Sequence, residues 1–251
     1  MKNSFISFMA LAFMASATLI GCSDDPATPS KAGTFYGEKQ ALGNDSVQSY
    51  IELNDAGEPV SVGIKFGAAA IQGLDTNAKM LMLDMPTGAS VAPYTFLQVD
   101  WNPFGHPPVG VYTQPHFDFH FYMAPQSEVM NIPAPPAFDM TPMDTKYLPA
   151  NYITDSVAIP MMGVHWVDVT SAEFNGGAFT QTFIYGTYKG NVTFIEPMIT
   201  KAFLESKPDT AISIKQPTAW QKSGYYPKEY HIHYDAASNS YAVELHDLTK
   251  N

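Results

Sequence analysis

The chain has 251 residues and a formal net charge of −11, with 45% hydrophobic and only 15% charged residues. This composition is typical of a folded protein, and the length suits one domain or at most two small ones. All 13 basic residues are lysines. Because the chain has no guanidinium group and is acidic, we expect it to bind neither nucleic acid nor anionic lipid through a broad charged surface.

The N-terminus has the pattern of a removable export signal. Lys2 precedes an apolar stretch from Phe5 to Ile20, which is too short for a comfortable membrane span. Leu19-Ile20-Gly21-Cys22 resembles the bacterial lipobox, and Cys22 is the only cysteine. We therefore predict a signal peptide over residues 1–21, a lipidated (palmitate-carrying) Cys22 with a flexible tether over 22–33, and a single β-rich domain over 34–251.

This interpretation implies a membrane anchor in a bacterial cell envelope, on the extracytoplasmic side. Ser23 directly after Cys22 resembles a sorting preference for the outer rather than the inner membrane. The alternative is an ordinary secretory signal that happens to contain a cysteine. Cys22 has no second cysteine to pair with, so a structural disulfide is excluded.

Alternating apolar and polar residues with turn residues between them dominate the rest of the chain. The pattern predicts an all-β, antiparallel sandwich or barrel. The strands it indicates are Val47–Leu53, Val60–Phe66, Lys79–Met85, Tyr94–Trp101, Glu229–Tyr234 and Tyr241–Leu245.

The middle of the chain departs from this pattern. Eleven of the 20 prolines fall between Pro103 and Pro160, so we expect long, ordered but irregular loops over the sheet there. One short helix is predicted, Pro197–Ser206, because proline is tolerated in a first helical turn and Pro208 follows.

One segment carries groups suited to chemistry. Residues 116–121 read His-Phe-Asp-Phe-His-Phe, so on a strand the three phenylalanines point to one side and His116, Asp118 and His120 to the other. A plain solvent face would rather carry Thr, Lys and Glu. His116 and His120 are about 13 Å apart along an extended strand, at the limit of sharing one ion.

Two other apolar segments supply candidates to complete a site, namely His165 and Glu196. Together with His116, Asp118 and His120 they form a candidate metal or ligand site of imidazoles and carboxylates, suited to zinc, iron or manganese. His106, in a proline-flanked loop, and Asp168 are weaker candidates. His231 and His233 share one face of the C-terminal hairpin, where exposure to solvent is the ordinary expectation, and His246 receives no role.

Several of these segments together are similar to an uncharacterised bacterial family of secreted proteins and lipoproteins, a domain of unknown function. The resemblance spans about residues 33–250 and is carried by Pro115–Tyr122 (PHFDFHFY), by Met162 to Val169 (MGVHWVDV) and by Phe194 to Thr200 (FIEPMIT). It implies a β-rich extracytoplasmic domain that can associate with itself. The family has no established activity, so it supplies no catalytic residues.

Three hypotheses for function follow. The first is a metal-dependent enzyme or sensor, in which an ion would activate water and a second carboxylate would act as base. The second is a non-catalytic envelope protein for binding or assembly, in which the His-Asp-His cluster is a structural hydrogen-bonded network. The third is a small-molecule binder with aromatic walls around the histidines. The sequence leaves the ligand, the oligomeric state and the catalytic residues, if any, open.

Overall fold

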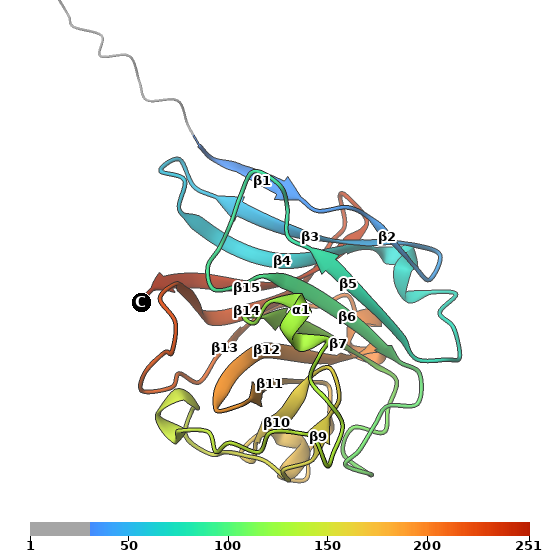
Figure 1. The fold of residues 1–251 in the computed structure, drawn as a ribbon. Coiled ribbons are helices and arrows are strands. Elements are labelled where there is room, and N and C mark those ends of the chain that lie inside the picture. Colours follow the sequence, from blue (N-terminus) through green and yellow to red (C-terminus); the bar gives the residue numbers. More distant parts are fainter. Residues whose placement is uncertain (1–30) are drawn as a thin grey trace, which may run out of the picture.

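The computed structural model describes residues 31–251 (Figure 1). The predicted signal peptide, the predicted lipidation site Cys22 and nearly all of the predicted tether lie outside the described residues. The first strand begins at Gly33.

Two antiparallel sheets make up the described chain. The first sheet contains β1 (Gly33–Tyr36), β2 (Gln40–Leu42), β3 (Asp45–Leu53), β4 (Pro59–Gly67), β13 (Asp209–Ser213), β14 (Tyr225–Asp235) and β15 (Ser240–Lys250). The second sheet contains β5 (Lys79–Asp84), β6 (Phe96–Asn102), β7 (His116–Tyr122), β8 (Tyr152–Ile153), β9 (Ala158–Ile159), β10 (Gly163–Asp168), β11 (Gln181–Tyr188) and β12 (Asn191–Thr200).

Helical structure is limited to short segments in this part of the chain. These are α1 (Gln126–Val129), α2 (Lys201–Glu205) and the 3-10 turns η1 (Ala68–Ile71), η2 (Thr145–Tyr147) and η3 (Ala172–Phe174). The predicted all-β antiparallel fold is therefore confirmed.

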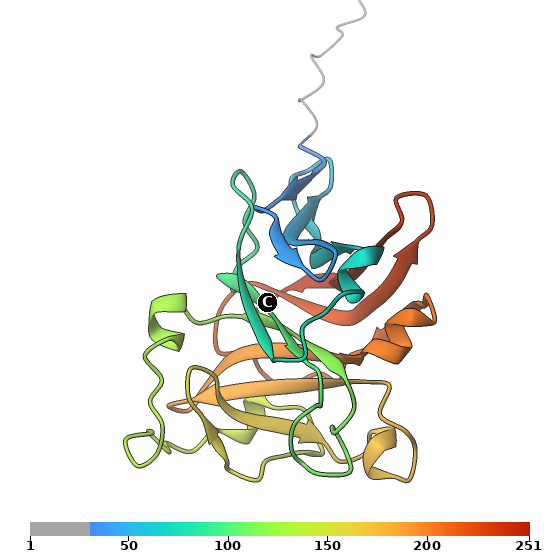
Figure 2. The same ribbon diagram turned by 90° about the vertical axis from the view of Figure 1, so that its right-hand side faces the viewer.

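The chain builds the first sheet from its two ends and the second sheet from its middle. The strand order is β1-β3-β4-β15-β14-β13 in the first sheet, with β2 added at β3, and β5-β6-β7-β12-β11-β10-β8 in the second, with β9 added at β10. Figures 1 and 2 show the second sheet lying below the first. The predicted strands all occur, each within a few residues of its expected ends.

The main core lies between the two sheets. Alternation on β7 directs Phe117, Phe119 and Phe121 into it, where all three are buried. From the first sheet, Phe66 stacks on Phe119 with ring centroids 5.9 Å apart. Burial of such large aromatic side chains is the chief source of stability in a sandwich of this kind.

The second sheet is also covered on its outer side. The connections between β6 and β7, between β7 and β10, and between β10 and β11 run across that face (Figure 1). They bury further apolar groups there, among them Tyr112, Val129 and Phe179. The predicted irregular, proline-rich segment thus covers much of the outer face of the second sheet, where small apolar clusters lie in addition to the main core on the inner face.

The predicted helix Pro197–Ser206 begins four residues too early. Pro197 lies in β12, opposite Phe183 of β11, and the helix α2 starts only at Lys201. Thr200, not Glu196, precedes the first helical turn, and its hydroxyl accepts a hydrogen bond from the Phe203 amide. Tertiary pairing of β12 therefore prevails over the local preference of proline for a first helical turn.

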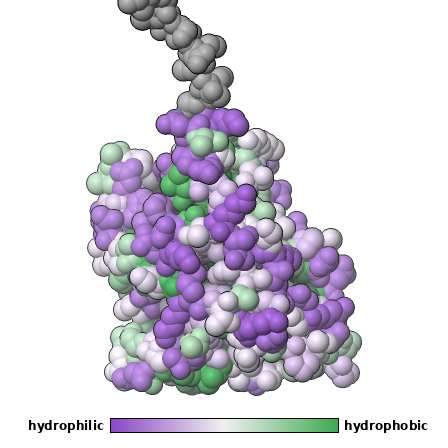
Figure 3. Space-filling model, turned by 90° about the vertical axis from the view of Figure 1, so that its left-hand side faces the viewer, coloured by the Kyte–Doolittle hydropathy of each residue, from purple (hydrophilic) through white to green (hydrophobic). Residues whose placement is uncertain are grey.

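The outer surface of the described chain is mixed. Figure 3 shows polar residues over most of one side, with apolar residues in small, separated areas. None of the helices that the structure describes has the length and apolar character that crossing a bilayer requires.

A truncation in the main core tests the sandwich. Phe119→Ala should lower the free energy of unfolding by about 3–5 kcal/mol, because a fully buried aromatic ring leaves a cavity between the sheets. Phe104→Ala is the matched control, because Phe104 is 74% exposed, and it should leave stability nearly unchanged. Chemical denaturation measures both. Equal effects for the two variants would contradict this core assignment.

Candidate functional site

A row of polar side chains covers the outer face of three neighbouring strands. On β7, His116, Asp118 and His120 point away from the main core, opposite to the three phenylalanines. The adjacent strand β6 repeats the alternation. Its pairing with β7 places Asn102 opposite His116, Asp100 opposite Asp118 and Gln98 opposite His120.

Glu196 reaches the same face from β12. Ile195 pairs with Phe121 and Met198 with Asp118, so Glu196 lies level with His120. His165 comes from β10, two strands away from β12, and is paired with Gly186 of the intervening strand.

Gly186 is what allows Phe194 to lie between these groups. A Cβ atom at Gly186 would come within 2.1 Å of the Phe194 ring. That ring packs edge-on against both imidazoles, with centroids 4.7 Å from His120 and 5.3 Å from His165. The absence of a side chain at Gly186 thus lets one aromatic ring position two histidines.

His106 is brought in by the loop between β6 and β7. Gly105 adopts φ +67°, and a Cβ atom there would lie 2.0 Å from the carbonyl oxygen of Tyr112. The loop closes through a hydrogen bond from the His106 amide to the same carbonyl (3.0 Å). This turn places the His106 ring 4.7 Å from the ring of His116.

The Asp118 triad consists of His106, His116 and Asp118. Asp118 Oδ1 lies 3.1 Å from His116 Nε2, and Asp118 Oδ2 lies 3.6 Å from His106 Nε2. The Nδ1 atoms of the two rings each lie 2.7 Å from a backbone carbonyl, of Pro107 and Gln114 respectively. A carbonyl only accepts, so Nδ1 carries the proton in both rings and Nε2 points toward the carboxylate.

The Glu196 triad consists of His120, His165 and Glu196. The Nε2 atoms of both rings face one carboxylate oxygen, Glu196 Oε2, at 3.5 Å and 3.7 Å. On its other side, His120 Nδ1 lies 3.6 Å from Asp100 Oδ2, which accepts a hydrogen bond from Gln98 (2.8 Å). Glu196 and His120 are each about 1% exposed, whereas the side chain of His165 is 26% exposed.

Many polar atoms of the two triads and of the neighbouring Asp100 are buried without a hydrogen-bond partner anywhere in the described chain. They are Asp100 Oδ1, His116 Nε2, Asp118 Oδ1, both ring nitrogens of His120 and Glu196 Oε2. Buried polar atoms are normally satisfied, because leaving one unpaired costs about 1–3 kcal/mol. Unpaired atoms gathered at one place indicate that a further group belongs between them.

Burial sets the charge states of the carboxylates. It raises the pKa of Glu196 well above its usual value, and the charges of Asp118 and Asp100 raise it further. Burial and the charge of Asp118 raise the pKa of Asp100 to about 8. Burial would raise the pKa of Asp118 as well, but contacts with His106 and His116 outweigh it and hold that pKa below its usual value.

The surroundings shift the pKa values of the imidazoles in opposite directions. Desolvation by the surrounding protein lowers the pKa of His120 to about 3 and that of His165 to about 4. At neutral pH both rings are therefore uncharged and cannot form a salt bridge with Glu196. Burial also acts to lower the pKa of His106, but contacts with Asp118 and the Pro107 carbonyl raise it above its usual value.

The separations fit ligands of a single metal ion. Two donors bound to one tetrahedral ion at about 2.0–2.2 Å lie about 3.3–3.6 Å apart. The nitrogen–oxygen distances in the two triads run from 3.1 to 3.7 Å. In each triad the three donor atoms all lie within 4.8 Å of one another. Neutral imidazole and carboxylate are a common donor set for zinc, and three protein ligands leave one position free.

The groups around the triads match the outer sphere of known metal sites. Metal-binding histidines usually donate their second N–H to a carbonyl or carboxylate, which fixes the ring. His106 and His116 do so through Pro107 and Gln114, and Asp100 stands beside His120. Asn102 donates a hydrogen bond to Asp118 Oδ2 (2.7 Å) and holds that carboxylate in turn.

The structure thus brings six of the predicted residues to one sheet face, but in two groups and not one. His116 and Asp118 are joined by His106, whereas His120 is joined by His165 and Glu196. Asp168 is not part of either group: it forms an ion pair with Lys215 (2.6 Å) and caps the following turn through Thr170. Asp100 is not among the site residues predicted from the sequence. The alternation of Gln98, Asp100 and Asn102 with Leu97, Val99 and Trp101 could have placed it on the same kind of polar face.

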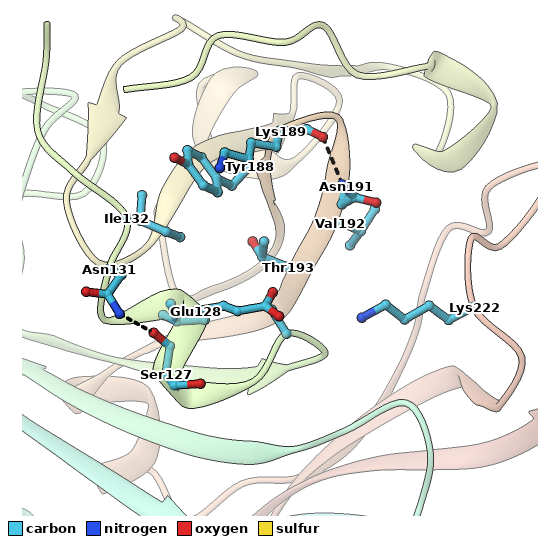
Figure 4. A pocket seen from close by; sticks show the side chains of 12 residues that line it. Ser127, Glu128, Asn131, Ile132, Tyr188, Lys189, Asn191, Val192, Thr193 and Lys222 are labelled. Atoms are coloured by element: carbon cyan, nitrogen blue, oxygen red, sulfur yellow. Dashed lines mark hydrogen bonds between the residues drawn. The ribbon is translucent and has the colours of Figure 1, made fainter. Parts of the chain in front are cut away.

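A separate cleft of about 620 Å³ lies beside α1 and the turn between β11 and β12 (Figure 4). Glu128, Asn131, Tyr188, Thr193 and Lys222 are among its lining residues. No member of the two triads lines this cleft, so it does not give access to them.

Comparison with known proteins gives one result. Residues 54–101, from the end of β3 through most of β6, match a family model described as TTHB210-like, hypothetical protein TTHB210. The match covers less than half of the chain and agrees with similarity to an uncharacterised family. Searches of curated proteins and of solved structures give no significant match.

A same-shape substitution separates a metal-binding role of Glu196 from a structural one. Metal-free Glu196→Gln protein should be at least as stable as metal-free wild type, because the change removes a desolvated carboxyl group that faces two uncharged rings. If Glu196 instead held protonated histidines in buried salt bridges, the loss would be about 3–5 kcal/mol. Denaturant unfolding in the presence of a chelator measures the difference.

Proposed function

We propose that this protein is a lipid-anchored, extracytoplasmic envelope protein that binds divalent transition metal ions in its two buried triads. Zinc is the first candidate, with iron and manganese as the others, given donor sets of two imidazoles and one carboxylate. The observation that carries the proposal is that imidazole nitrogens face buried carboxyl groups without forming a hydrogen bond to them. His116 Nε2 faces Asp118 in this way, and His120 Nε2 faces Glu196.

A cation would satisfy the atoms that the protein leaves unpaired. The carboxylates Asp100, Asp118 and Glu196 lie close enough for Asp118 and Asp100 to raise the pKa of Glu196. A divalent ion at each triad would offset this repulsion and release the protons held there. His106 and His165 are the more exposed members, with side chains 36% and 26% exposed, so an ion could enter beside them.

The metal content of the purified protein tests this proposal. Full-length protein isolated in detergent without a metal column should retain one ion per intact triad by elemental analysis. Glu196→Gln should lose the ion of its own triad, and Asp118→Asn should lose the other. Asp168→Asn is the matched control and should retain both, because its carboxylate pairs with Lys215 outside the triads. Substoichiometric metal in wild type, with an unchanged melting temperature in chelator, would refute the proposal.

The anchor is a separate part of the proposal. If Cys22 is lipidated, metabolic labelling with a palmitate analogue should mark the wild-type protein and not Cys22→Ala. The variant should leave the membrane fraction, because acyl chains supply about 0.8 kcal/mol per buried methylene. Cys22→Ala protein that stays with the outer membrane would show that the anchor is wrongly assigned, whatever the metal content.

One observation favours the alternative, a binding or assembly protein with a structural cluster. The raised pKa of His106 beside Asp118 allows an ion pair that would brace the loop between β6 and β7 without any metal. No such pair is available to Glu196, because His120 and His165 are uncharged at neutral pH. The Glu196 triad therefore discriminates between the two functions.

A further inference from the structure

Another set of metal-binding side chains lies on the first sheet, outside the proposed function. Glu229 and His231 belong to β14 and His246 to β15. Glu229 pairs with His246, and His231 is one step along the same face, opposite Glu244. The alternate residues Tyr230, Ile232 and Leu245 are buried in the main core. Glu229, His231 and His246 therefore lie on the outer face, and we refer to them as the hairpin triad.

The hairpin triad is compact. Glu229 Oε1 lies 2.8 Å from His231 Nε2 and 3.5 Å from His246 Nδ1. The two imidazole rings stack with centroids 4.3 Å apart and an angle of 21° between planes. One donor atom from each residue lies within 4.8 Å of the other two.

One nitrogen in this triad makes no hydrogen bond. His246 Nδ1 is shielded from solvent and has no hydrogen-bond partner among the described residues. It is directed at Glu229 Oε1, which is hydrogen-bonded to His231 Nε2. The side chains themselves remain about a quarter to a third exposed, so an ion can reach them from solvent.

The surrounding charges also favour a cation. Glu244 lies 3.7 Å from His231 Nδ1 and 4.0 Å from His233 Nδ1. It accepts a hydrogen bond from Tyr50, which fixes it beside the triad. His233 is thus held next to Glu244 and lies outside the group of three donor atoms.

We propose that Glu229, His231 and His246 form a solvent-accessible site for a divalent transition metal ion, with water completing the coordination. Because the site is open to solvent, affinity should follow the intrinsic order for such ligands, in which Cu²⁺ binds most tightly. The site would exchange its ion readily, unlike the buried triads.

Titration of full-length protein with Cu²⁺, followed by electron paramagnetic resonance, tests this site. Wild type should show nitrogen hyperfine coupling from imidazole ligands. His246→Ala and Glu229→Gln should each weaken Cu²⁺ binding at least about tenfold. His233→Ala is the matched control on the same face and should bind like wild type. Both triad substitutions are at the surface, and Glu229→Gln preserves side-chain shape, so folding should be unaffected.

The outcomes separate this site from the buried triads. Retention of zinc in His246→Ala with loss of the Cu²⁺ signal would support the hairpin triad alone. Wild-type Cu²⁺ affinity in His246→Ala and Glu229→Gln would overturn it. So would a signal that disappears in Glu196→Gln and persists in His246→Ala, because that signal would come from the buried triads.

Discussion

The desolvation of three carboxyl groups beside histidines is the interaction around which the second sheet is arranged. Asp100, Asp118 and Glu196 are all buried, and burial, together with the charges of neighbouring carboxylates, raises the pKa values of Asp100 and Glu196. A carboxylate facing the lone pair of a neutral histidine is unfavourable unless a proton or a metal ion lies between them. The fold must therefore supply either protons or cations to this face, and the donor separations suit a cation.

This polar layer explains why the protein carries such long, proline-rich loops. An antiparallel sheet in a sandwich commonly leaves one face in water. Here β7 is buried on both faces, with phenylalanines in the main core and His116, Asp118 and His120 beneath the loops. Prolines keep the covering segments ordered without long hydrogen-bonded elements. The loops thus exclude water from the triads and leave His106 and His165 at their margins.

The sequence predicts what is local and misses what depends on register. Alternation identifies β7 and both of its faces, and with them the shared face of His116, Asp118 and His120, but not which histidine contacts Asp118. It cannot show that Glu196, 76 positions after His120 in the numbering, lies level with it, since that depends on β12 pairing with β7. His106 is placed by one loop closure at Tyr112, which no periodicity reveals. The predicted helix start at Pro197 is wrong for the same reason, because the pairing of β12 outweighs the preference of proline for a first helical turn.

The Glu196 triad and the hairpin triad each consist of two histidines and one glutamate, yet the two settings should select ions differently. In the Glu196 triad, Phe194 packs against both rings, so the protein would impose the donor positions and an ion would have to adapt to them. On the hairpin the side chains are partly exposed and are held by the strand register and by contacts with one another, so the intrinsic preference of an ion would count for more. Burial, more than the choice of ligands, would therefore determine whether a proposed site on this protein selects an ion by geometry or by intrinsic affinity.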